Sequence, residues 1–170
     1  MLPADRVRRP ALERSGLTPA RLKRAYRREA VRGAAAVGWL ATLDAADREA
    51  FRVLGRRLAW ALVAHLDAGD DEARRHQLTE ARAASAEYGR RGAALGLSLS
   101  DVVEGFLAFR RPFLGEIAGV ARRRGFDADE VARLHDDADR ALDGLLVATM
   151  SGHSVGTIGD WHPDGKPAIE

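Results

Sequence analysis

Residues 88–117 read YGRRGAALGLSLSDVVEGFLAFRRPFLGEI, and this stretch predicts the end of one helix, a turn and the start of a longer helix. Gly96 can adopt the positive φ that ends a helix. Ser98 stands three residues before Asp101, a variant of the capping box that begins the next helix. An apolar residue then recurs every three or four positions, which indicates one buried face: Val102, Phe106, Phe109, Phe113, Ile117 and Val120. We expect this Phe-rich helix to be the spine of the fold.

The rest of the chain predicts helices packed around that spine. They are expected at residues 18–33, 44–69, 71–95, 98–125 and 127–151, with a short separate turn of helix at 36–43. Pro19 suits the first turn of a helix, where its missing N–H costs nothing. Pro112 lies about three turns into the Phe-rich helix and predicts a kink there. The fold class is therefore all-α: a single globin-like or up-and-down bundle of about five helices with a kinked central helix.

The helix at 71–95 has a face of mostly small residues, on which we expect the Phe-rich helix to pack. The residues on this face are Leu78, Ala81, Ser85, Tyr88 and Gly92. Large side chains fit best against small ones, and packing of this kind can leave a ligand cavity between helices. The residues expected to line such a pocket are Phe106, Phe109, Phe113, Tyr88 and His65.

Length and composition indicate one cytoplasmic domain of 170 residues. We expect a basic arm at 1–17, a helical domain at 18–151 and a flexible tail at 152–170. The chain has no cysteine, which excludes disulfides, zinc–thiolate sites and a cysteine nucleophile. Its longest apolar run, residues 58–66, is too short to cross a bilayer, so no membrane partner is expected.

Positive charge is concentrated at the N-terminus. Residues 1–33 carry a net charge of +7, which leaves −5 for the remainder of the chain. Such a segment can bind nucleic acid, the protein's own body or a dimer partner, and 11–30 has the local pattern of a helix-turn-helix recognition helix. The candidate residues for contact with a partner or nucleic acid are Arg21, Lys23, Arg24, Arg27, Arg28, Arg110 and Arg111.

No catalytic or metal site is predicted. The histidines do not form an i, i+4 pair, and no HExxH motif is present. Glu104 and Glu116 are about 18 Å apart along one helix, too far for joint acid–base work. An enzyme is therefore not expected, and neither is a cofactor. His65, next to an apolar stripe, is the one candidate for haem binding.

Several short motifs occur together in the centre of the chain. They are Tyr88-Gly89-Arg90-Arg91, Gly96-Leu97-Ser98-Leu99, Val102-Val103 and Phe106-Leu107-Ala108-Phe109-Arg110-Arg111. Their combination resembles the RsbRD-type N-terminal domain, found at the front of RsbT co-antagonist proteins and related bacterial regulators, over about residues 39–150. The resemblance implies an all-helical sensory domain that dimerises and signals to an attached output module, with no catalytic residues. No output domain follows Ser151, so we expect a stand-alone sensor or adaptor, or a fragment of a longer protein.

The leading hypothesis is a non-enzymatic regulatory domain for signalling, stress response or transcriptional regulation. It is expected to bind a small ligand or a protein partner in a signalling cascade. A homodimer is expected because Trp39, Trp60 and Val63 carry more apolar surface than one helix face hides. Two alternatives stay open: a DNA-associated regulator acting through residues 6–32, and a haem-binding globin-like sensor that uses His65.

Overall fold

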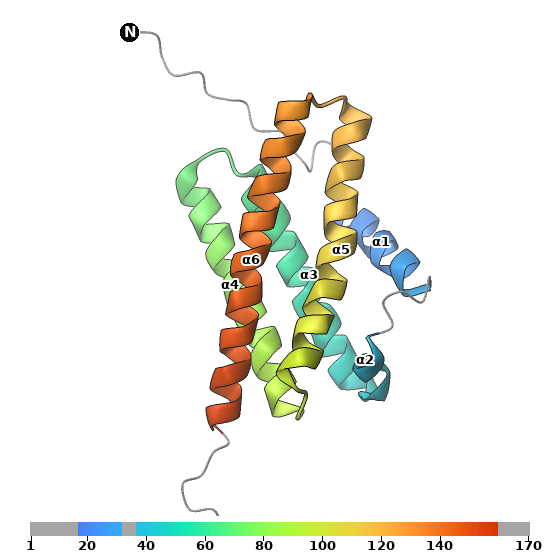
Figure 1. Ribbon diagram of the computed structural model, residues 1–170, viewed down its shortest axis with the longest axis vertical. Coiled ribbons are helices and arrows are strands. Elements are labelled where there is room, and N and C mark those ends of the chain that lie inside the picture. Colours follow the sequence, from blue (N-terminus) through green and yellow to red (C-terminus); the bar gives the residue numbers. More distant parts are fainter. Residues whose placement is uncertain (1–16, 32–36, 160–170) are drawn as a thin grey trace, which may run out of the picture.

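A computed structural model describes residues 17–31 and 37–159 of the chain. Within these ranges it contains helices and no strand, which confirms the all-α expectation. In chain order the helices are α1 (Pro19–Val31), α2 (Gly38–Thr42), α3 (Ala45–Asp67), α4 (Asp71–Ala94), α5 (Leu99–Arg124) and α6 (Ala128–Gly159) (Figure 1). None of the helices in this part of the chain combines the length and the apolar character needed to cross a bilayer.

The turn between α4 and α5 is built from the local signals seen in the sequence. Gly96 has a φ of 72°, and just beyond it the Leu97 N–H donates to the carbonyl of Gly92 at 3.0 Å. Ser98 caps α5: its Oγ accepts from the Asp101 N–H at 3.1 Å, and the Asp101 carboxylate accepts from the Ser98 N–H at 3.0 Å. The predicted helix end and capping box are therefore confirmed.

The four long helices α3 to α6 form an up-and-down bundle (Figure 1). α3 packs on α4 and α5 packs on α6, and these two hairpins meet chiefly along α4 and α6. Because each hairpin reverses the chain, α4 and α6 run parallel to each other (Figure 1). α1 lies across the outside of α5, and α2 lies near the start of α3.

Glycines allow α4 and α6 to approach closely. A Cβ atom at Gly89 would collide with the carbonyl oxygen of Thr149, and one at Gly152 with the carbonyl oxygen of Ala86. α4 therefore packs mainly on α6, and the expectation that the Phe-rich helix fills its small face is correct only near the end of α4, where Val102 of α5 lies against Gly92. The sequence analysis missed the contact with α6 because Gly152 and Gly156, which complete it, lie in a segment that was assigned to the tail.

The core has a main part, formed by the four-helix bundle together with Leu17 and Leu22 of the α1 segment, and a smaller part beside α2. The apolar stripe of α5 from Phe106 to Val120 belongs to the main part, as predicted, whereas Trp39 and Phe51 form the centre of the smaller one. Trp39 is 8% exposed and Val63 is 2% exposed, whereas Trp60 is 45% exposed. One chain therefore hides two of the three residues on which the dimer expectation rested.

The structure does not confirm three further expectations about how the chain is organised. α6 continues to Gly159, beyond the predicted end at residue 151, because contact with α4 offsets the low helix propensity of its glycines. Leu17, assigned to the arm, is fully buried. α5 runs through Pro112 as one helix, and the predicted kink is not confirmed. The expectations for residues 1–16 and 160–170 lie outside the described residues.

Candidate functional site

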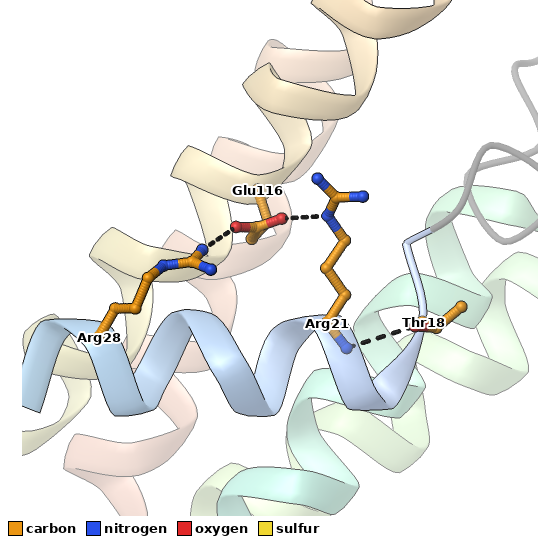
Figure 2. Close-up of polar contacts among 4 residues, drawn as sticks. All are labelled: Thr18, Arg21, Arg28 and Glu116. Atoms are coloured by element: carbon orange, nitrogen blue, oxygen red, sulfur yellow. Dashed lines mark hydrogen bonds and ion pairs between the residues drawn. The ribbon is translucent and has the colours of Figure 1, made fainter.

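Glu116 is a buried carboxylate on α5 at which two helices are joined. It is 9% exposed, and two arginines of α1 bind it. Arg21 Nε donates to Oε2 and Arg28 Nη2 donates to Oε1, each at 2.7 Å. Figure 2 shows the carboxylate between the two side chains, with one oxygen turned toward each. The negative charge is thus matched by two positive charges from far away in the sequence. We call these three residues the Glu116 clamp.

The spacing of the two arginines makes the clamp possible. Seven residues are about two helical turns, so Arg21 and Arg28 project from one face of α1 about 10 Å apart. A carboxylate between them can accept from both at once. The Oγ1 atom of Thr18 accepts from the Arg21 N–H at 3.3 Å (Figure 2), and this cap satisfies one of the free N–H groups of the first turn.

Tyr26 makes the apolar part of the same contact. Its ring stacks on Phe109 with the centroids 5.6 Å apart, and its hydroxyl donates to the Phe109 carbonyl at 3.1 Å. Pro112 has no N–H, so this turn of α5 is short of one backbone donor. The carbonyl that loses this donor is that of Ala108, four residues earlier, and the Tyr26 hydroxyl binds the next carbonyl, that of Phe109. Burial raises the pKa of Tyr26, which keeps the hydroxyl neutral and able to donate.

The residues predicted to line a ligand pocket are only partly brought together. Phe109 lies next to Phe106 and Phe113, with ring centroids 6.0 Å and 6.1 Å from its own. Tyr88 instead packs edge-on against Phe51, with the centroids 4.8 Å apart, in the smaller part of the core. Burial raises the pKa of Tyr88. The pocket itself stays a prediction.

His65 is buried near the end of α3, where it contacts α4. Its Nδ1 lies 2.9 Å from the carbonyl oxygen of Arg74. A carbonyl oxygen can only accept, so Nδ1 carries the proton. This bond ties the two helices of the α3–α4 hairpin together, which gives His65 a structural role. Among the described residues, no group of three or more His, Asp or Glu side chains is placed to hold a metal ion.

Arg110, a predicted partner contact, binds carboxylates of the same chain. Its guanidinium donates to Asp139 at 2.8 Å and to Asp143 at 2.9 Å, both on α6. Nδ1 of His135 lies 3.1 Å from the Asp139 carboxylate. Burial lowers the pKa of Arg110, but the hydrogen bonds and charges of the two carboxylates outweigh burial, and the net shift is upward. This arginine therefore joins α5 to α6.

The remaining basic candidates lie at the surface. Lys23, Arg24 and Arg27 are exposed on α1, and Arg111 is exposed on α5. On α1 these three positions follow one another at steps of one and three, so they share the side turned away from α5. The basic helix is therefore divided: Arg21 contributes to the face bound to Glu116, and the other face presents its cations to solvent.

Sequence analysis missed two buried polar residues. Glu116 stands between Phe113 and Ile117, inside the apolar stripe. This position could have indicated a buried carboxylate, and a buried carboxylate needs a cationic partner. His153 was assigned to the tail. It is 9% exposed on α6, and its Nε2 lies 2.8 Å from the carbonyl oxygen of Leu97, in the turn between α4 and α5.

An exposed apolar patch extends over α5 and α6. We call it the α5–α6 patch; its side chains, which are 38–62% exposed, are Leu107, Val147, Met150 and Val155. α5 and α6 are antiparallel neighbours, and Arg110 pairs with Asp143. Leu107 lies one turn before Arg110 and Val147 one turn after Asp143, so both come to the same level of the bundle. The patch is therefore centred on Leu107 and Val147, with Met150 one turn beyond Val147 on α6 and Val155 about two turns beyond it.

Comparison with known proteins finds one family. The family model described as the RsbT co-antagonist protein rsbRD N-terminal domain matches residues 44–156. The match covers all of α3, α4 and α5 and most of α6, while α1 and α2 precede it. No curated protein and no solved structure matches the chain significantly.

Proposed function

Because the chain belongs to the family of the RsbT co-antagonist protein rsbRD N-terminal domain, a bacterial stress-response signalling domain, we propose that it acts as a non-enzymatic, cytoplasmic sensor or adaptor. In this proposal the domain forms a homodimer and responds to a small ligand or a protein partner. Such a response is a shift in population between two packings of the helices, and it requires that the ligand bind one packing better than the other.

The α5–α6 patch is the observation that supports dimerisation. Single exposed apolar residues are ordinary, but several of them on two adjacent helices can form an interaction site. In a two-fold dimer a patch meets its own copy, so apolar side chains on both helices would face their equivalents. We therefore propose a second copy of this chain as the occupant of the α5–α6 patch.

A single charge in the patch tests the dimer. We expect Val147→Asp to weaken self-association at least tenfold, about 1.4 kcal/mol, because each copy would bury an unpaired carboxylate. Sedimentation equilibrium at tens of micromolar protein measures the effect. Val53→Asp is the matched control, because Val53 is a 40% exposed valine on α3 and lies outside the patch; it should leave the dimer intact. A monomeric wild type, or equal effects of the two variants, would contradict the proposal.

A second candidate function, binding to nucleic acid, is favoured by the outer face of α1. Lys23, Arg24 and Arg27 are exposed there. We expect weak binding to duplex DNA whose affinity falls steeply as salt rises, because phosphate contacts release counterions. The triple variant K23Q/R24Q/R27Q should make this salt dependence shallower in fluorescence anisotropy.

The matched control removes three exposed arginines from α3, α4 and α6. The variant R57Q/R75Q/R133Q changes the net charge by the same amount and leaves α1 unaltered. Equal losses in the two triple variants would show a dependence on net charge alone. That result, or no binding by the wild type at low salt, would exclude this candidate.

A further inference from the structure

We propose that the face of α5 covered by α1 is a binding surface for a basic amphipathic helix of a partner protein, and that α1 occupies it as an intramolecular competitor. The inference rests on the proposed function only in that the domain binds a protein partner. It specifies which surface binds the partner, what chemistry the partner has, and which helix must leave the surface for the partner to bind.

The surface combines aromatic and acidic recognition on one side of α5. Phe109, Pro112 and Glu116 follow each other at steps of three and four, so they share one face. Phe109 offers a ring and a carbonyl, which Tyr26 uses, and Glu116 offers a carboxylate oxygen in each of two directions. A helix that fits this face carries two guanidinium groups seven residues apart and an aromatic residue between them.

The buried carboxylate makes the surface selective. A helix without cations would cover Glu116 and leave its charge buried and unpaired, which is strongly unfavourable. An acidic helix would be repelled. Guanidinium groups satisfy the carboxylate with directed, charge-assisted hydrogen bonds. The surface therefore selects an arginine-bearing amphipathic helix, of which α1 is the example present in the chain.

Several features favour release of α1, which is held by Leu22 in the main core as well as by the clamp. It has 13 residues, and an isolated helix of that length is marginal in water, so its helical state depends on docking. It precedes the residues that match the family, and the bundle is built from α3 to α6. The side chains of Arg21 and Arg28 are 32% and 56% exposed, so water reaches both ion pairs. Opening of such a segment costs less than unfolding of the bundle.

The test opens the surface in the full-length chain and offers the helix in trans. The variant R21E/R28E places two further carboxylates beside Glu116, and we expect amide hydrogen exchange in α1 to rise at least tenfold while exchange in α4 and α6 stays unchanged. A fluorescent peptide of residues 17–31 should then bind this variant at least tenfold more tightly than it binds the wild type, in which α1 competes.

Two controls isolate the clamp. K23E/R27E reverses the same number of charges on the exposed side of α1, and we expect it to keep α1 docked and peptide affinity at the wild-type level. Adding E116Q to the opened variant should reduce peptide binding at least tenfold. If R21E/R28E is not folded by circular dichroism, R21Q/R28Q serves for the same measurements, because it removes the ion pairs without adding charge.

Four results would overturn the inference. They are unchanged exchange in α1 of the opened variant, no peptide binding although α1 is released, peptide binding that ignores E116Q, and dissociation of a wild-type dimer by the peptide. The last result would assign the surface to α1 of a second copy. Failure of the dimer proposal can be distinguished from failure of this inference, because sedimentation measures self-association of the wild type in the absence of peptide.

Discussion

At the scale of single residues, buried polar side chains link separate helices through backbone groups. Trp39 Nε1 donates to the carbonyl of Asp101 at 2.8 Å, which ties α2 to the first turn of α5. His153 reaches the turn between α4 and α5 in the same manner. Each bond satisfies a polar group that would otherwise be buried without a partner, at a cost of about 1–3 kcal/mol. Trp39 therefore fixes the short helix α2 on the bundle, and His153 fixes the turn that joins α4 to α5.

The two tyrosines, both partly buried in the core, predict how stability depends on pH. Burial raises the pKa of Tyr26 and of Tyr88 in the folded state, whereas a tyrosine in the unfolded chain ionises near pH 10. Above about pH 10 the unfolded state therefore loses a proton that the folded state keeps. The free energy of unfolding then falls as pH rises, by about 1.4 kcal/mol per pH unit for each tyrosine.

Urea unfolding at pH 9, 10 and 11 measures this fall. We expect the wild type to lose stability more steeply above pH 10 than Tyr26→Phe or Tyr88→Phe, because each variant removes one of the two contributions. Tyr26→Phe should also be about 1 kcal/mol less stable at neutral pH, because the hydrogen bond to Phe109 is lost. An equal slope in the wild type and in a variant that carries both Tyr26→Phe and Tyr88→Phe would contradict the assignment.

At the scale of the elements, the contact between α4 and α6 depends on glycine. We expect Gly152→Ala to lower the free energy of unfolding by about 1–3 kcal/mol or more, because its Cβ would collide with the backbone of Ala86 and the helices must separate. Gly115→Ala is the matched control within α5: no atom lies within 4 Å of its Cβ position. It should stabilise by up to about 1 kcal/mol, since alanine favours a helix more than glycine.

Thermal or urea unfolding compares the two variants directly. Equal stability of Gly152→Ala and the wild type would mean that α4 and α6 are not in close contact at this level. The contrast between Gly152 and Gly115 also explains why the sequence could not tell which glycine is more important for stability. Helix propensity is the same at both positions, and only the neighbouring helix distinguishes them.

At the scale of the whole molecule, the bundle presents two separate surfaces on α5. Leu107, in the α5–α6 patch, and Glu116, in the clamp, are nine residues apart, which is about two and a half turns and places them on opposite sides of the helix. A second copy at the patch and a basic helix at the clamp can therefore bind at the same time. For this reason the dimer and the displacement of α1 are independent predictions with independent measurements.

The sequence by itself determined the elements, and in large part which of their faces are buried. The capping box of Ser98, the turn at Gly96 and the apolar stripe of α5 were readable because a cap and a periodicity involve residues only a few positions apart. The same reasoning missed the end of α6, since the glycines that weaken it locally are stabilised by a distant helix.

Only the tertiary structure decided which face meets which. Apolar burial has no direction, so a small face on α4 suited α5 as well as α6, and the sequence could not choose between them. It also could not pair Glu116 with Arg21 and Arg28, because these arginines are 95 and 88 residues away from it in the sequence. Ion pairs of that separation are set by how helices cross, and the crossing is a property of the packed bundle alone.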